Sequence, residues 1–204
     1  MSPKRQELQE ALVVAATRTI AERGYQAQRA RELAAEVGCA VGAIYNVFPD
    51  MDALILAVKS RTLDEVQADV SGQLGTDETR TRAEGEARLM ALSRVYLEFA
   101  QRNRRLWVSA FEHSSPVTPY WLDFMSRLDA IFANIEGPLI TMLPDAPPRR
   151  RALLARALFS AVHGVVNLGL DQKLGSISND ELHWQVRIVL EAALRGLPTA
   201  DELS

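Results

Sequence analysis

The residues with the clearest chemistry lie between Arg31 and Phe48, where two short helical segments flank a turn. Ala34 is small enough for two helices to cross closely, and Gly38, four residues later, suits the turn between them. This spacing predicts a helix-turn-helix, whose second helix can enter the major groove of duplex DNA. The alternative for the same stretch is a pair of small core helices that bind no nucleic acid.

The second of these helices, predicted over 41–47, has small or polar residues on its outward side. Asn46 carries an amide that can pair with adenine, and Val41 or Ala43 can touch a thymine methyl group. Basic and polar residues nearby can bind phosphates, which sets affinity and register, although a solvated tail is an equal alternative for Lys4 and Arg5. The predicted DNA contacts are Lys4, Arg5, Arg29, Arg31, Ala40, Val41, Ala43, Tyr45 and Asn46.

The elements that position these residues are predicted to be helices throughout, because apolar residues recur at steps of three and four along the chain. Gly24 and Gly38 can end two of the helices, and Asp50 can cap a long one. A polar stretch at 71–81 is the best internal boundary. The predicted helices cover 5–23, 30–37, 41–47, 51–70, 83–101, 104–112, 120–143, 149–173 and 180–196.

Residues 12–58 resemble the tetracycline-repressor (TetR) family of bacterial transcription regulators. The resemblance lies in Ile-Ala-Glu-Arg-Gly-Tyr at 20–25, Leu-Ala-Ala-Glu-Val-Gly at 33–38, Gly42, and Ile-Tyr-Asn-Val-Phe-Pro at 44–49. It implies an all-α protein with a three-helix DNA-binding head at 1–50. It also implies a helical bundle at 51–204 that binds a small effector and dimerises. Phe159 and His163-Gly164 are similar to a C-terminal subgroup named for Trp followed by His-Gly, with Phe159 in the place of the Trp.

The sequence departs from the family pattern at positions that often hold backbone-binding lysines. The family often has Ser-Lys before the glycine of the second helix and a lysine two residues after the proline. Here Ala40-Val41 and Met51 stand at those places. The alternative function is therefore a helical small-molecule-binding or interaction protein without operator recognition.

The predicted body contains a concentration of aromatic residues together with a few polar ones, which suits a ligand pocket between helices. Most of these aromatics can equally fill a core. A satisfied core histidine is likewise the ordinary alternative for His163. The predicted ligand contacts are Trp107, Phe111, His113, Tyr120, Trp121, Phe124, Arg127 and His163.

The last two predicted helices carry apolar residues on more than one side, which indicates a subunit interface. A deeply buried hairpin within one chain is the alternative. The predicted interface residues are Leu154, Leu158, Ala161, Val162, Val165, Trp184, Ile188 and Val189. Together with the family resemblance, this pattern predicts a homodimer that represses from a palindromic operator until a small, mostly apolar effector releases it.

Composition narrows the remaining classes of function. The net charge is −3, but residues 1–61 hold 8 basic against 7 acidic residues, so charge alone identifies no partner. One cysteine, Cys39, excludes a disulfide framework and suits a reducing cytoplasm. No spacing matches a metal site, a cofactor loop or a catalytic triad, so we expect neither a cofactor nor an enzyme. No apolar run has the roughly 20 residues of a membrane helix.

Overall fold

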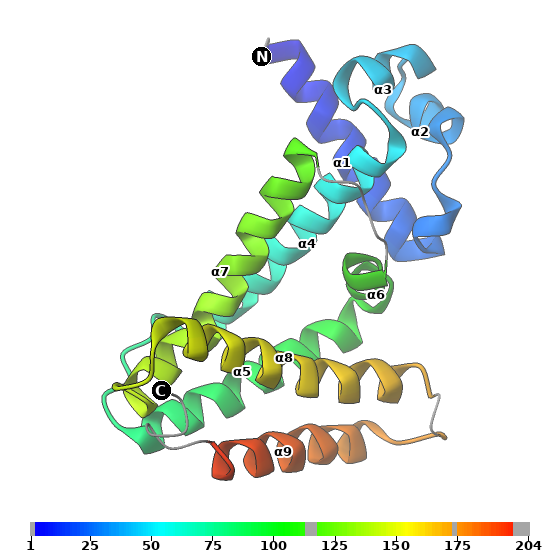
Figure 1. Cartoon of the computed structure of the whole chain (residues 1–204). Helices are drawn as coiled ribbons and strands as arrows, with labels where there is room; N and C mark the ends of the chain where they lie inside the picture. Colours follow the sequence, from blue (N-terminus) through cyan, green and yellow to red (C-terminus); the bar gives the residue numbers. More distant parts are fainter. Residues whose placement is uncertain (1–2, 113–117, 173–174, 198–204) are drawn as a thin grey trace. The chain divides into compact units, whose positions relative to one another are not determined.

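The computed structural model describes residues 3–112, 118–172 and 175–197, which form nine α-helices and one short 3-10 turn (Figure 1). This confirms the all-α prediction. The helices are α1 (Pro3–Arg23), α2 (Ala30–Val37), α3 (Val41–Val47), α4 (Met51–Leu74), α5 (Arg82–Arg102), α6 (Arg104–Glu112), α7 (Pro119–Met142), α8 (Pro148–Leu170) and α9 (Asn179–Arg195), with η1 (Tyr25–Ala27) between α1 and α2.

Helix ends follow the expected capping chemistry. The Asp50 carboxylate accepts a hydrogen bond from the Ala53 backbone N–H at 2.7 Å, as predicted for the start of α4. A reciprocal capping box starts α9, where Ser178 and Glu181 each accept a hydrogen bond from the other's backbone N–H. Three expectations were inaccurate: α4 continues to Leu74, α8 ends at Leu170 rather than at 173, and η1 was not foreseen. The three-residue η1 is too short to leave a periodic pattern in the sequence.

The chain divides into two compact units. The first unit holds residues 1–65 and 103–128, and the second holds 66–102 and 129–204. The polar stretch at 71–81 therefore lies inside the second unit and is not the boundary that the sequence indicated. Packing also joins part of α4, α6 and the start of α7 to the head, because Leu54, Val58 and Leu106 belong to the same buried cluster as α1. The division at residue 50 into two functional domains stays a prediction.

The core of the first unit lies where α1 packs against α2, α3 and α6. Leu12, Ile20, Ile44, Phe48 and Leu54 are fully buried there. Two ion pairs join α1 and α2 at the surface of this core. Arg23 pairs with Glu32 at 3.0 Å, and Arg18 pairs with Glu36. Exposed pairs contribute little to stability, so apolar burial is the main support of α2 and α3.

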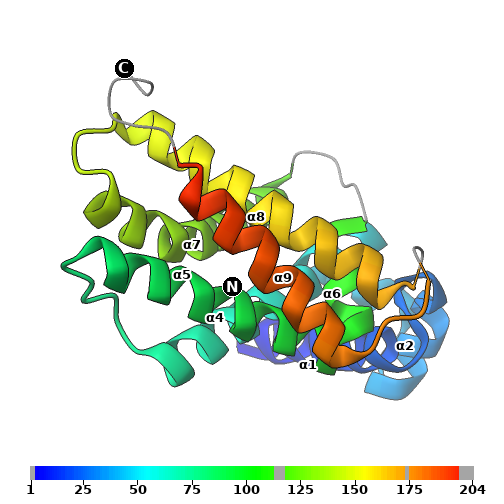
Figure 2. The same ribbon diagram turned by 90° about the horizontal axis from the view of Figure 1, so that it is seen from below.

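The second unit is built on α5, α8 and α9, with α8 and α9 side by side (Figure 2). Leu182, Val186, Leu190 and Leu194 form the buried side of α9. By length and composition α8 could cross a membrane, a property that the core helix of a soluble protein can share, although polar residues interrupt its apolar run. Only 22% of its apolar window is buried within the chain. Much of its apolar surface is thus uncovered in a single copy.

Gly38 ends α2 with a φ of +74°, in the left-handed region that side chains rarely adopt. We expect Gly38→Ala to lower the free energy of unfolding by about 1–2 kcal/mol through backbone strain. The matched control is Gly42→Ala inside α3, where a Cβ meets no atom within 4 Å and alanine favours the helix. Denaturant titration measures both changes, and an equal effect of the two substitutions would contradict the turn geometry.

Candidate DNA-binding face and ligand cavity

The predicted helix-turn-helix is present as α2, a left-handed turn at Gly38, and α3 (Figure 1). The Cys39 backbone N–H donates to the Ala34 carbonyl at 2.9 Å, which closes the turn. Leu33 and Ala34 from α2 and Ile44 and Val47 from α3 are buried. The apolar side of α3 is therefore packed against the core of the first unit, and its opposite side faces solvent.

The exposed side of α3 carries the side chains that the sequence predicted to read DNA. Tyr45 is 47% exposed and Val41 is 36% exposed, and Asn46 also lies on the surface. Exposed side chains on a rigidly held helix can contact base edges and phosphates. Ala40 is exposed as the N-cap of α3, whereas Ala43 is half-buried and can present only part of its methyl group.

The predicted phosphate contacts lie on the surface of the same unit. Lys4, Arg5, Arg29 and Arg31 are all exposed. The Arg29 guanidinium donates to the backbone carbonyls of Gln26 and Gln28 at 2.7 and 2.9 Å, which fixes its position next to α2. The Gln28 side chain is buried and donates to the Ala16 carbonyl at 2.7 Å. Gln28 thus attaches this segment to α1, a role that its polar type did not reveal.

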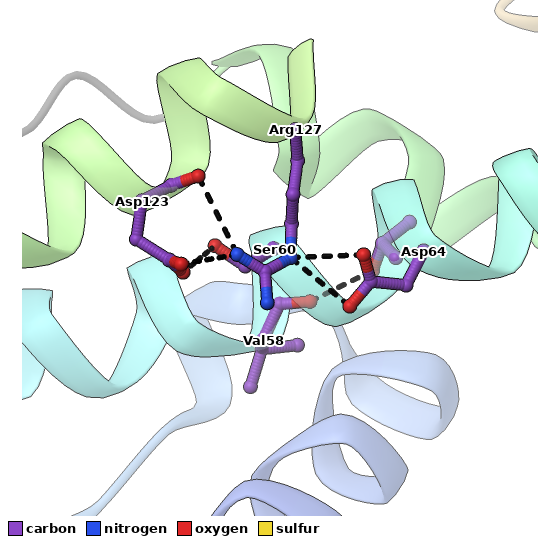
Figure 3. A network of polar contacts seen from close by, with 6 residues as sticks. Val58, Ser60, Asp64, Asp123 and Arg127 are labelled. Carbon is purple, nitrogen blue, oxygen red and sulfur yellow. Dashed lines mark hydrogen bonds and ion pairs between the residues drawn. The ribbon is translucent and has the colours of Figure 1, made fainter. Parts of the chain in front are cut away.

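Most of the predicted ligand contacts lie in the first unit, where Tyr120 and Arg127 line a pocket of about 580 Å³ whose lining does not include Trp107, Phe111, Trp121 or Phe124. Trp107 is 2% exposed and Phe124 is 4% exposed, so both are core residues there. Phe111, Tyr120 and Trp121 are half-buried in the same unit. The Arg127 guanidinium on α7 is paired with the carboxylates of Asp64 and Asp123 (Figure 3). The prediction for His113 lies outside the described residues.

The second unit contains an apolar cavity of about 60 Å³. One buried water molecule needs roughly 10–15 Å³ of such cavity volume, so the cavity has room for only a few water molecules. Ser93, Tyr96 and Asn134 are the polar residues at its wall. The apolar wall consists of Val66, Val70, Leu89, Leu92, Ile131, Ile135, Leu158, Phe159, Val162 and Leu190. Five helices thus contribute to one cavity, which no local sequence pattern indicated.

His163 lies beside this cavity rather than in its wall. The Tyr96 hydroxyl and His163 Nδ1 are 2.6 Å apart, and the imidazole stacks on the Phe159 ring with centroids 5.5 Å apart. Burial lowers the pKa of His163 below its usual value of 6.5. A neutral His163 therefore holds the Tyr96 ring against Phe159, and both rings form cavity wall. The predicted role in ligand binding is thus indirect at most.

The lowered pKa of His163 predicts a loss of stability in acid. Between the folded-state pKa and about 6.5 the unfolded chain binds more protons than the folded chain, so stability falls as pH drops below 6.5. We expect His163→Gln to reduce the difference in unfolding free energy between pH 7.5 and pH 5.5. Urea titrations at both pH values measure this difference, and an unchanged difference in the variant would show that His163 is not the group responsible.

The predicted dimer residues fall into two groups. Leu158 and Val162 are each 6% exposed and line the cavity, so a partner subunit cannot reach them. The physical reason is that α8 buries one side inside its own unit, and both residues lie on that side. Trp184 is 55% exposed, and the rest of the predicted set is half-buried, namely Leu154, Ala161, Val165, Ile188 and Val189.

Comparison with known proteins identifies both parts of the chain. Residues 12–58 match the model described as bacterial regulatory proteins of the tetR family. Residues 89–193, about half of the chain, match the tetracyclin repressor-like C-terminal domain. The resemblance to a Trp-His-Gly subgroup within it stays a prediction. The HTH-type transcriptional regulator BetI of Brucella anthropi is 30% identical over 142 residues, which cover 69% of this chain and 70% of that protein.

Solved structures have the same fold at lower sequence identity. RolR in complex with resorcinol has a TM-score of 0.68 and 18% identity, with 100% of this chain and 94% of that chain covered. FadR of Bacillus subtilis in complex with stearoyl-CoA has a TM-score of 0.63 and 17% identity, with 93% and 99% covered. Both family models and the BetI relative lead to one conclusion: the chain belongs to the TetR family of DNA-binding transcriptional regulators, which are not enzymes.

Proposed function

We propose that the protein is a homodimeric one-component repressor of the cytoplasm that binds a near-palindromic operator. Two heads related by two-fold symmetry would occupy successive major grooves, about 34–36 Å apart. The observation that carries this proposal is the short helix α3, which has a fully buried apolar back and an exposed front bearing Val41, Tyr45 and Asn46. Arg29, Arg31, Lys4 and Arg5 would bind the DNA backbone beside it.

The effector of this repressor would be small and mostly apolar, and it would bind in the cavity of the second unit. Ten of the thirteen lining residues are apolar, which favours transfer of an apolar molecule out of water. RolR and FadR, which share the fold, were solved with resorcinol and stearoyl-CoA. The cavity is smaller than the 300–1,000 Å³ of ordinary ligand pockets, so binding must push its walls apart. A bound ligand therefore favours a conformation of the protein in which the cavity is wider. If this conformation binds DNA less well, the ligand's preference for it drives release from the operator.

The homodimer would form through the uncovered apolar surfaces of α8 and α9. On α8, Leu153, Ala157, Gly164 and Leu168 are separated by four, seven and four residues, which places them on one helical face away from the buried side. On α9, Trp184 is the largest exposed apolar residue. Burying these surfaces against a second copy explains why α8 is apolar enough for a membrane helix yet belongs to a DNA regulator.

Gly164 offers a direct test of this interface. A Cβ at Gly164 meets no atom within 4 Å, so an arginine fits within one chain but obstructs a close helix partner. We expect Gly164→Arg to convert dimers to monomers in sedimentation velocity without a loss of helicity. Gly72→Arg is the matched control, because Gly72 also has open space in the second unit. A dimeric Gly164→Arg variant would place the interface elsewhere.

Selection of bound fragments from genomic DNA tests the regulatory function. We expect recovery of fragments that share one near-palindromic sequence, and reduced recovery in the presence of an apolar compound that fits the cavity. The competing function, a ligand-binding helical protein without operator recognition, is favoured by Ala40, Val41 and Met51 at positions where the family often has other residues. That function predicts compound binding with no enriched fragment.

A further inference from the structure

The first turn of α7 contacts the end of the helix that faces DNA. The Tyr120 hydroxyl donates to the Val47 backbone carbonyl at 3.2 Å. Val47 is the last residue of α3, so its carbonyl has no partner inside that helix. The ring of Tyr120 also lies against the fully buried Phe48, with centroids 5.5 Å apart. Tyr120 therefore completes the C-terminal end of α3 from a position 73 residues away.

The same face of α7 is attached to α4 within the first unit (Figure 3). The Ser60 hydroxyl donates to the Asp123 carboxylate at 3.0 Å. The Arg127 Nε donates to both oxygens of Asp64 at 2.9 and 3.0 Å, and Arg127 also pairs with Asp123. Tyr120, Asp123 and Arg127 are spaced by three and four residues and lie on one helical face. This face holds the start of α7 in a fixed register on α4.

Further along, the same two helices form part of the cavity wall in the second unit. Ile131, Asn134 and Ile135 continue the spacing of the α7 face and line the cavity. The Asn134 side-chain amide donates to Gln67 of α4 at 2.7 Å. Val66 and Val70 of α4 line the cavity as well. A ligand larger than a few atoms must therefore displace one or more of the five helices that line the cavity, and α4 and α7 are two of them.

We propose that α7 reports occupation of the cavity to α3, through the hydrogen bond and ring contact that Tyr120 makes at Val47 and Phe48. This inference rests on the proposed function and concerns its regulation. A continuous helix is stiff, so a displacement of α7 at 131–135 also moves residue 120. Movement of Tyr120 breaks its hydrogen bond to Val47. The Val47 carbonyl is then unpaired, and the C-terminal end of α3 is no longer held in place. Tyr120 is thus a positioning residue for DNA reading. The Tyr120 hydroxyl is protonated at neutral pH and can donate, and burial raises its pKa further.

The test replaces the unknown effector by filling the cavity from within. Val162→Phe on α8 and Leu89→Phe on α5 each add volume at the wall from a helix other than α4 and α7. Two such variants keep the test available if one of them fails to fold, which thermal unfolding reveals. Each is combined with Tyr120→Phe, which removes the hydroxyl but keeps the ring against Phe48.

Fluorescence anisotropy with an operator fragment recovered by the genomic selection gives the affinity of each protein. We expect a filled cavity to weaken operator binding about tenfold in the parent protein, and less than about threefold in the Tyr120→Phe background. The control, Tyr25→Phe in η1, should retain the tenfold effect. An equal effect with and without the Tyr120 hydroxyl, or no effect from either filling variant, overturns the inference. A parent protein that binds no operator overturns the proposed function instead.

Discussion

Replacement of Tyr45 and Asn46 by alanine is expected to weaken operator binding at least about a hundredfold without unfolding the protein. Both side chains are exposed on α3, so their removal opens no space in the core. A base contact of a good reading helix is worth about 1–3 kcal/mol, and two losses of about 1.4 kcal/mol each weaken binding about a hundredfold. Fluorescence anisotropy measures the affinity, and circular dichroism with thermal unfolding checks the fold.

The control for this experiment is a double variant of exposed polar residues in the second unit, Gln73→Ala with Glu78→Ala. It should bind the operator as the parent protein does. If the Tyr45 and Asn46 variant also binds unchanged, α3 is not the helix that reads DNA.

Phe48→Ala is expected to cause the largest loss of stability, about 3–5 kcal/mol. Phe48 is fully buried, belongs to the core that α1 and α4 share, and has the Tyr120 ring beside it. Truncation leaves a cavity that the surrounding helices can close only in part. Urea titration at fixed protein concentration measures the change, since the proposed dimerisation would make apparent stability depend on concentration.

Phe48→Leu serves as the graded comparison, because it retains most of the apolar volume. It should cost clearly less than the alanine variant. A loss below about 1 kcal/mol for Phe48→Ala would mean that the end of α3 is not fixed by this core.

The helices and the turn of the head could be predicted because local chemistry determines them. Gly38 supplies the left-handed turn, Asp50 caps α4, and the buried positions of α2 and α3 repeat at helical spacing. Each of these signals lies within a few residues of the element it specifies. The family resemblance over 12–58 rests on the same local features.

The cavity and its neighbours could not be predicted in the same way. Leu158 and Val162 have the spacing of an interface helix, and only the packing of five helices places them at a cavity wall. Trp107 and Phe124 have the composition of a ligand pocket but fill the core of the other unit. The pairing of Tyr120 with Val47 joins residues 73 positions apart. Long-range packing decides such contacts, and periodicity does not encode it.

The two-unit organisation has a consequence for regulation. α4 and α7 both contribute residues to the core or surface of the first unit and to the cavity wall of the second. If α4 alone coupled the cavity to α3, the Tyr120 hydroxyl would not affect how a ligand weakens operator binding. Coupling through both helices would make the Arg127 pairs with Asp64 and Asp123 part of the response, because they hold α7 in register on α4.

The salt dependence of binding to the selected operator fragment tests the central claim most directly. A dimer that places α3 in two major grooves neutralises several phosphates, so the logarithm of its affinity should fall steeply and linearly with the logarithm of salt concentration. At each salt concentration it should also bind the operator more tightly than an unrelated duplex of equal length. Equal affinity for both duplexes, or an affinity that does not change with salt, would contradict a DNA-reading role for α3.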